Sequence, residues 1–301
     1  MVALRRQIEV IGAAWGLGGA EPDCAKAPAV LTPLLLAALR ACGAQAVPGP
    51  MLRPSEGERR KQAAVSRLCG RLASAVADSL RQGRLPCVLG GDHSCAGGTW
   101  TGVARTLQGA LGLVWVDAHM DSHTPGTSHT GRLHGMPLAW LLGQDDDPLY
   151  GLAAGVLEPR HVCLIGVRSF EPEEDQRLRQ LGVRVFHIEE VRERGLGAVF
   201  ADALAIATAG TQGFGISIDL DVVTPEEAPG VGTPVPGGIS GAQLARAVAQ
   251  TGARADLLAV ELVEYAPRLD PDQRSARVAI ETLVAALCGP GHEAQVLADA
   301  V

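Results

Sequence analysis

Three residues that can bind metal ions stand at alternating positions in the segment LVWVDAHMDSH, residues 113–123. They are Asp117, His119 and Asp121, and they follow an apolar run with the composition of a buried strand. Chain that emerges at the carboxyl edge of a sheet can aim alternate side chains into one cleft. An Asp-x-His-x-Asp run is weak evidence by itself, because polar residues are common where a strand ends.

The same chemistry follows two other apolar runs. VLGGDHS ends with Asp92 and His93, and FGISIDLDVV contains Asp219 and Asp221. Carboxylate-rich sites suit hard divalent cations such as Mn²⁺ or Mg²⁺, whereas structural zinc prefers Cys and His. Without cations, so many carboxylates in one cleft would repel one another and raise each other's pKa. Two divalent ions bring four positive charges, which four aspartates would balance: Asp117, Asp121, Asp219 and Asp221.

Apolar, β-branched runs recur along the chain and alternate with helical patterns. Three-and-four spacing of apolar residues predicts helices over 62–82, with Gly83 as the stop, and over 274–288. Strand and helix alternation predicts a parallel sheet covered on both faces, so the metal-binding residues share its carboxyl edge. We therefore expect a three-layer α/β fold forming a single domain over 1–301, with the Pro/Gly-rich stretch 225–241 as a loop lining the site. The expected strands lie near 7–12, 85–90, 111–116, 161–167, 183–187, 214–219 and 256–263.

Composition is typical of a soluble intracellular enzyme. The chain has 301 residues, of which 47% are hydrophobic, so it can bury one large core. A net charge of −7 disfavours nucleic acid and anionic membrane surfaces as partners. The seven cysteines form no CxxC pair and are expected to be reduced thiols in the cytoplasm. No continuous apolar stretch reaches the length of a transmembrane helix, so we expect no membrane contact.

The chain resembles the ureohydrolases, the family of arginase and agmatinase, which are binuclear manganese amidinohydrolases. GGDHS, DAHMD and SIDLD are similar to the three metal motifs of that family, in the same order. Further similarity covers nearly the whole chain, through IGAAWGLGGAEPDCAKAPAVL, HGMP, IGVRS and GTPVPGG. The resemblance implies an arginase-like fold, two Mn²⁺ per chain, a small guanidino substrate and a homo-oligomer, either a trimer or a hexamer.

Two metals roughly 3.5–4 Å apart can share a water, lower its pKa towards neutrality and present hydroxide to a trigonal carbon. Ligands that bridge two metals must be carboxylates, since an imidazole has one available lone pair. The resemblance implies attack of the bridging hydroxide on the guanidinium carbon, followed by release of an amine and urea. It also implies the ligand set: Asp117 and Asp219 bridge, His93 and Asp121 complete one ion, and His119 and Asp221 complete the other.

Two further residues match catalytic positions of the family. His134, in RLHGMP, matches its proton-shuttling histidine, and an ordinary histidine pKa near 6.5 suits proton transfer at neutral pH. Glu264 matches the acidic residue that holds the guanidinium, a planar cation that a carboxylate binds through two parallel hydrogen bonds. Together with the ligand Asp121, these residues are the predicted catalytic set.

The loop after DAHMD has the length and frame of arginases, but its substrate-binding positions differ. His123, Thr130 and Arg132 stand where arginases carry Asn, Ser and Asn for the carboxylate of the amino acid, and Ser128 joins them in the predicted substrate site. Glu171 stands where arginases place an Asp for the α-amino group. Arg132 can bind a carboxylate more strongly than an amide would, so a substrate with an acidic tail is compatible with this loop. These differences leave open whether that substrate is arginine or another guanidino acid.

The sequence therefore predicts a hydrolase of linear amidines. The preferred prediction is an arginase that makes ornithine and urea. The alternatives are hydrolysis of another guanidino or formimino acid, as in a guanidinobutyrase, agmatinase or formimidoylglutamase, or a binding protein that keeps the fold without catalysis. Thr224 replaces a third Asp of the family's last metal motif, and YAP replaces a common VNP. Neither change removes an expected metal ligand.

Overall fold

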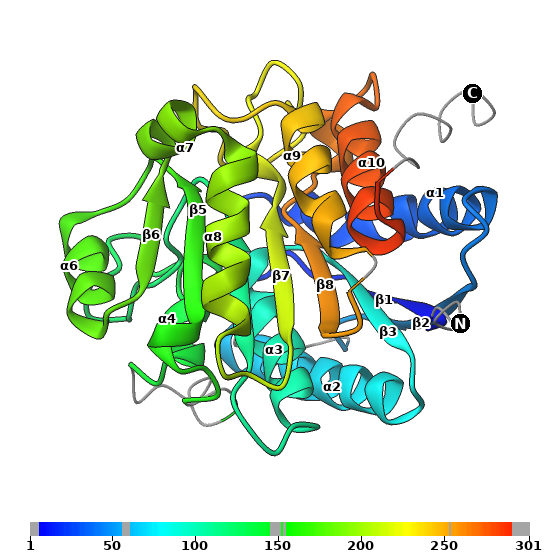
Figure 1. Cartoon of the computed structure of the whole chain (residues 1–301), viewed down its shortest axis with the longest axis horizontal. Coiled ribbons are helices and arrows are strands. Elements are labelled where there is room, and N and C mark those ends of the chain that lie inside the picture. The colour runs from blue at the N-terminus through cyan, green and yellow to red at the C-terminus, as the bar shows by residue number, and fades with distance from the viewer. Residues whose placement is uncertain (1–5, 56–60, 145–151, 153–154, 253, 291–301) are drawn as a thin grey trace.

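The computed structural model describes residues 6–55, 61–144, 152, 155–252 and 254–290. Its centre is an eight-stranded sheet in which all neighbouring strands are parallel, flanked by helices (Figure 1). The predicted α/β class with a parallel sheet between helices is confirmed. In sheet order the strands are β2 (Ala46–Leu52), β1 (Ile8–Ala13), β3 (Leu85–Gly90), β8 (Leu257–Val263), β7 (Phe214–Asp219), β4 (Gly112–Val116), β5 (Val162–Val167) and β6 (Arg184–His187).

Helices cover both faces of the sheet and form two separate core clusters with it. One cluster lies under α1 (Ala27–Ala41), α7 (Ile188–Arg194), α8 (Leu196–Thr208), α9 (Gly241–Val248) and α10 (Arg274–Cys288). The other lies under α2 (Lys61–Arg81), α3 (Ala96–Ala104), α4 (Pro137–Leu141) and α6 (Pro172–Leu181). Because both faces are covered, alternate side chains of one strand enter different clusters, and the strands appear in sequence as continuous apolar runs.

The seven strands expected from those runs are all present, within a residue or two of the predicted bounds. The eighth strand, β2, was missed because Pro48, Gly49 and Pro50 interrupt its apolar pattern. It is an edge strand that pairs only with β1 among the described strands. Proline is tolerated at an edge, since its missing N–H is not needed by a second neighbour.

The segment Pro22–Ala41, which includes α1, is long and apolar enough to cross a membrane, judged by length and composition alone. Such composition also occurs in core helices of globular folds. Leu31, Leu35 and Leu39 are buried in the cluster beneath α1, and α1 packs against β1, β3 and α10. Core packing therefore accounts for the apolar residues on the buried face of α1, whereas Val30 on the same helix is 37% exposed.

The four central strands β3, β8, β7 and β4 are neighbours in the sheet and end at the same edge. His93 follows β3, Glu264 follows β8, Asp219 ends β7, and Asp117 follows β4. Residues separated by up to 171 positions in the chain are thus brought to one place by parallel strand order. This is the edge at which open α/β sheets bind ligands.

Candidate metal and substrate site

One group of metal-capable atoms surrounds the imidazole of His93. Its Nδ1 atom lies 2.9 Å from Asp121 Oδ2 and 3.3 Å from an Oδ2 atom of each of Asp117 and Asp219. One ligand atom from each of the four residues lies within 4.8 Å of the others. All four residues are buried. The structure therefore brings together four of the six predicted ligands in a first group.

A second group adjoins the first and shares Asp117 with it. His119 Nδ1 lies 3.0 Å from Asp221 Oδ2 and 3.5 Å from Asp117 Oδ1. The two oxygens of Asp117 thus face different histidines, as expected of a carboxylate that serves two cations. Asp219, the other predicted bridge, belongs to the first group, and its Oδ1 atom accepts a hydrogen bond of 2.9 Å from the backbone N–H of Asp221.

The donor set fits divalent cations. His93 Nδ1 is buried, and no described residue offers it a well-aligned hydrogen bond, although three carboxylate oxygens surround it. A buried polar nitrogen in that position is costly unless a further group binds it. Imidazole nitrogen with several carboxylate oxygens is a ligand set suited to Mn²⁺ and related ions. We infer that the two groups can each hold one metal ion.

Electrostatics of the aspartates point the same way. Burial, reinforced by the charges of Asp221 and Asp117, raises the pKa of Asp219 well above its ordinary value. Burial and the charge of Asp117 likewise raise the pKa of Asp121 to about 6. Burial would also raise the pKa of Asp117, but His119 and His93 outweigh it and hold that pKa low. So dense a set of carboxylates is stable in its ionised form only with added positive charge.

Two site residues have left-handed backbone conformations that are unusual outside glycine. Asp121 has φ 46° and Glu264 has φ 65°. Such conformations cost about 1–3 kcal/mol each and are typical of functional sites. Backbone hydrogen bonds hold both: the N–H of Glu264 donates to Gly91 O at 2.8 Å, and the carbonyl of Asp121 accepts from the N–H of Leu138 at 2.9 Å. The close approach at Gly91 needs glycine, because a Cβ atom there would lie 1.8 Å from Trp15 O.

His134 and Glu264, two of the predicted catalytic residues, are in direct contact. His134 lies in the turn Leu133–Gly135, and Glu264 follows β8. His134 Nδ1 lies 2.9 Å from Glu264 Oε1, which also accepts a hydrogen bond of 2.9 Å from the backbone N–H of His93. Burial would lower the pKa of His134, but the charge of Glu264 prevails and raises it to about 9. At neutral pH His134 is therefore protonated and can act as an acid. An ordinary histidine pKa near 6.5 would leave it mostly neutral at that pH.

The cluster opens to solvent through two histidines. The side chains of His119 and His134 remain 26% and 15% exposed, whereas those of His93 and Asp117 are fully buried. A small substrate can therefore approach from the side on which His119 and His134 lie.

The predicted substrate residues divide into two sets. His123 Nε2 lies 2.9 Å from Glu171 Oε2 and 3.3 Å from Glu174 Oε2. Glu171 and Glu174 are the N-cap and the third residue of α6, where each carboxylate accepts a backbone N–H of the other. Glu174 was not predicted, although a Glu three residues after a possible N-cap is the signature of this capping box. Two predicted substrate residues, His123 and Glu171, thus contact each other, and His123 occupies one carboxylate oxygen of Glu171.

The remaining predicted substrate residues line the outer loop. Ser128 is half-buried, and its Oγ accepts a hydrogen bond of 3.0 Å from the N–H of Gly131. Thr130 and Arg132 are exposed, and Arg132 is the N-cap residue of the short 3₁₀ turn Leu133–Gly135 that carries His134. Thr130 Oγ1 accepts a hydrogen bond of 3.3 Å from the backbone N–H of Arg132. The role of Ser128, Thr130 and Arg132 in substrate binding stays a prediction.

Several residues that shape the site were missed from sequence. Trp115 stacks on the ring of His93, with centroids 4.2 Å apart, and its Nε1 donates to Asp117 Oδ2 at 2.9 Å. Ser217 Oγ lies 2.9 Å from His93 Nε2 and donates to Glu261. The signal for Glu261 was present, because it is the one charged residue among the apolar residues of 257–263. Asp92, noted among the strand-end residues, caps the next turn by accepting N–H groups of Gly18 and Ser94.

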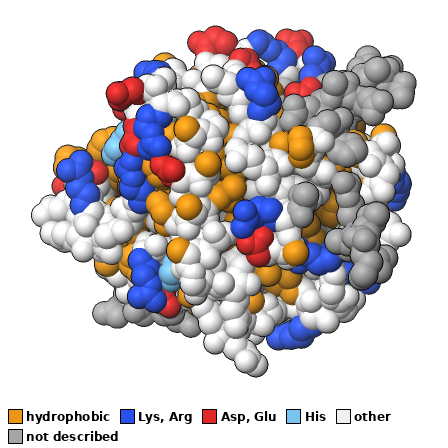
Figure 2. All heavy atoms as spheres, viewed as in Figure 1, with side chains coloured by type: hydrophobic (Ala, Val, Ile, Leu, Met, Phe, Trp, Pro, Cys, Tyr) orange, Lys and Arg blue, Asp and Glu red, His pale blue; other side chains and the backbone are white. Residues whose placement is uncertain are grey.

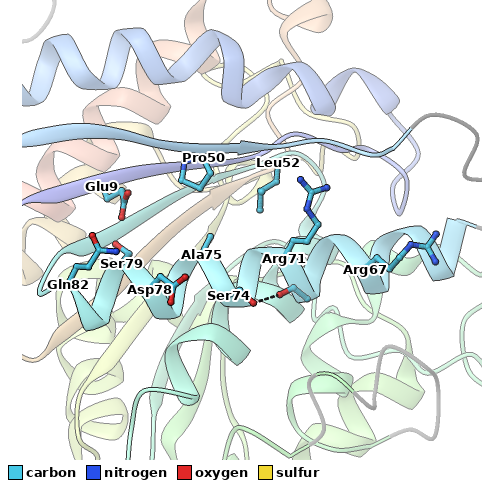
Figure 3. A pocket seen from close by; sticks show the side chains of 11 residues that line it. Glu9, Pro50, Leu52, Arg67, Arg71, Ser74, Ala75, Asp78, Ser79 and Gln82 are labelled. Atoms are coloured by element: carbon cyan, nitrogen blue, oxygen red, sulfur yellow. Dashed lines mark hydrogen bonds between the residues drawn. The ribbon is translucent and has the colours of Figure 1, made fainter.

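A separate groove of about 630 Å³ lies between α2 and the strands β1 and β2 (Figure 3). It contains none of the predicted site residues. Its charged side chains have partners of their own: Glu9 pairs with Arg84, Asp78 with Arg81, and Arg71 donates to the carbonyl of Arg53. On the face of the molecule shown in Figure 2, acidic and basic side chains are interspersed.

Comparison with known proteins agrees with this geometry. The model of the arginase family matches residues 9–289. The arginase of Bacillus caldovelox is 40% identical over 223 residues, which are 73% of this chain and 74% of that protein. The arginase of Bacillus subtilis is 38% identical over 221 residues, again 73% of this chain and 74% of that protein.

Solved structures give the same result for the fold. The crystal structure of the Bacillus subtilis arginase superimposes with a TM-score of 0.87 and 32% identity, covering 94% of this chain and 98% of that one. The proclavaminate amidino hydrolase of Streptomyces clavuligerus shares the fold at a TM-score of 0.73 and 22% identity, covering 94% and 91% of the two chains. The protein described here belongs to the arginase family, and it is a ureohydrolase that acts on the guanidino group of a small substrate.

Proposed function

We propose that this protein hydrolyses L-arginine to L-ornithine and urea with two Mn²⁺ ions per chain. The observation that carries the proposal is the position of Asp117. Its two oxygens face the two histidines of adjoining ligand groups, and the His134–Glu264 pair lies beside the first group, at the backbone of His93. The residues that would hold the metal ions and their water, the carboxylate that would bind the guanidinium, and the proton donor thus lie at one edge of the sheet.

Two divalent cations, when bound, supply a water of lowered pKa as the nucleophile. His93, Asp121 and Asp219 would hold one ion, His119 and Asp221 the other, and Asp117 both. Glu264 is buried, and its carboxylate is held by the N–H of His93 and by His134. A substrate guanidinium would replace the positive charge of His134 as its partner, through paired charge-assisted hydrogen bonds.

Proton transfer then falls to His134. Because Glu264 raises its pKa to about 9, the imidazole enters the reaction protonated at neutral pH. The ring nitrogen that does not contact Glu264, Nε2, can donate its proton to the departing amine. Loss of this proton leaves a neutral imidazole that takes up a proton from solvent on the partly exposed side of the ring.

Selectivity for the substrate's tail rests on the outer loop. Arg132 is exposed and carries the charge that an α-carboxylate requires. A second candidate follows from the pair at Glu171, whose Oε2 atom is held by His123 at 2.9 Å. If that contact persists with substrate bound, the anchor for an α-ammonium is weakened, and a guanidino acid without an amino group, such as 4-guanidinobutyrate, is favoured.

A urea-release assay with Mn²⁺-loaded protein tests the proposal and separates the candidates. Arginine carries an α-carboxylate and an α-ammonium, whereas 4-guanidinobutyrate has only the carboxylate. Agmatine has neither group on an α carbon. We expect the order arginine, then 4-guanidinobutyrate, then agmatine in kcat/KM. Preference for guanidinobutyrate would support the second candidate. Preference for agmatine, or release of formamide from a formimino acid without urea from arginine, would overturn the proposal.

A further inference from the structure

A chain of hydrogen bonds runs from the proposed ligand His93 into the core and ends at Glu261. His93 Nε2 lies 2.9 Å from Ser217 Oγ, and Ser217 Oγ donates to Glu261 Oε2 at 2.8 Å. The register of the sheet makes this contact, because Ser217 on β7 and Glu261 on β8 are direct partners. His93, Ser217 and Glu261 are all fully buried.

Glu261 is an unusual residue for a central strand. It lies between β3 and β7, and its described partners are neutral donors: Ser217, the Thr99 hydroxyl and the Cys95 thiol, whose sulfur is 3.4 Å from Oε1. A buried carboxylate without a paired cation is costly, and Val or Leu would fill such a position at no electrostatic cost. The next titratable group along the network is the imidazole of His93, one hydroxyl away.

The direction of the hydrogen bonds follows from the carboxylate. Ser217 donates to Oε2 of Glu261, and Thr99 and Cys95 donate to its other oxygen, so the carboxyl group is the acceptor of all three bonds. Ser217 Oγ can then only accept from His93, which places the imidazole proton on Nε2. In a neutral imidazole this leaves the lone pair on Nδ1, the atom that faces Asp117, Asp121 and Asp219. Stacking on Trp115 fixes the ring plane, and the relay fixes its tautomer.

We propose that Glu261 is a positioning residue for the metal centre: acting through Ser217, it selects the His93 tautomer that presents Nδ1 as a ligand. This inference rests on the proposed metal-binding function. Outer partners of a ligating histidine commonly have this role, and their loss typically costs roughly 10- to 100-fold in metal affinity or activity.

Glu261→Gln gives a sharp test because it keeps shape while reversing polarity. The amide oxygen can accept from Thr99, and the amide N–H then donates to Ser217, whose hydroxyl hydrogen turns towards His93 Nε2. That arrangement places the imidazole proton on Nδ1, where it opposes metal binding. Ser217→Ala removes the link and leaves Glu261 in place, so it tests the same relay if Glu261→Gln folds poorly.

The measurement is the Mn²⁺ dissociation constant of each site, obtained by titration while free Mn²⁺ is followed by electron paramagnetic resonance. We expect the affinity of one of two sites to fall roughly 10- to 100-fold in Glu261→Gln and in Ser217→Ala, with the other site little changed. In the double variant the losses should not add, because both act through one path. Thr99→Val is the matched control: it removes a Glu261 partner on the side away from His93 and should lower thermal stability without changing either affinity.

Three outcomes would overturn the inference. Folded Glu261→Gln and Ser217→Ala with unchanged affinities would show that Glu261 only supports the core. An equal loss of Mn²⁺ affinity in Thr99→Val would lead to the same conclusion, because a general loosening of the packing around Glu261 would then explain all three losses. Wild-type protein that binds no Mn²⁺ would overturn the proposed metal centre itself, and the relay with it, so the two failures are distinguishable.

Discussion

His134 Nδ1 and Glu264 Oε1 lie 2.9 Å apart, so the proposed proton donor and the proposed guanidinium anchor form an ion pair with each other. Both side chains are largely buried, which strengthens the pair by excluding water. A guanidinium bound to Glu264 would bring a second positive charge next to His134, which favours release of the His134 proton. Substrate binding and proton transfer by His134 are therefore expected to be coupled through Glu264.

His134→Asn should lower kcat by roughly 10²- to 10⁴-fold, the range of general acid–base catalysis, because the amide cannot supply the proton that the departing amine needs. Metal content should stay at the wild-type value, since His134 belongs to neither ligand group. Steady-state urea release and elemental analysis are the measurements. An unchanged kcat would reject the proton-donor role, and loss of metal would show His134 to be a ligand.

Glu264→Gln should lower kcat/KM about ten- to a hundredfold, because the variant loses a charged hydrogen bond worth about 1.5–3 kcal/mol. It should also bring the pKa of His134 down from about 9, since the charge of Glu264 is what raises it. A ¹H NMR titration of metal-free protein follows the second effect. A His134 pKa that stays near 9 in the variant would show that another group sets it.

Asp117→Ala should reduce bound Mn²⁺ at both sites, because Asp117 is the residue common to the two ligand groups. Asp221→Ala is the comparison: it lies in one group and should weaken mainly one ion. Bound metal per chain, measured after dialysis, distinguishes them. Equal loss in the two variants would contradict the shared position of Asp117.

Arg132→Ala should erode the preference for arginine over agmatine about tenfold or more in kcat/KM, since one charge-assisted contact to the α-carboxylate is lost. Arg81→Ala, on the exposed surface of α2, removes the same charge elsewhere and should leave the ratio unchanged. The arginine-to-agmatine ratio is the readout. A ratio unaffected by Arg132→Ala would show that this loop does not bind the carboxylate.

Glu174 should make stability depend on pH. Burial raises its pKa from an ordinary 4.5 to about 8, so the folded protein binds this proton more tightly than the unfolded chain does. Its contribution to the free energy of unfolding is fully present below about pH 4.5 and is lost as the pH rises through 8. Glu174→Gln should therefore gain stability relative to wild type between pH 5 and pH 8.5, measured by chemical denaturation. Glu173→Gln, exposed on the same helix, should show no such gain.

The amino-acid sequence by itself determined the fold class and the strands that carry the site. Strands buried on both faces show up as apolar runs, and metal-capable residues directly after three such runs imply a shared sheet edge. Seven of the eight strands were predictable in this way, and β2 was not, because prolines at a sheet edge erase the pattern.

Only the tertiary structure decided which side chains meet. Strand order places β8 and β7 between β3 and β4, and that order brings Glu264 to His93 and Asp219 to Asp121. It also brings Ser217 and Glu261 into register, a contact between residues 44 positions apart. The pKa of about 9 at His134 has the same origin, since it depends on a carboxylate 130 positions away in the chain. Local patterns carry the periodicity of single elements, whereas electrostatics depends on distances that only the packed sheet sets.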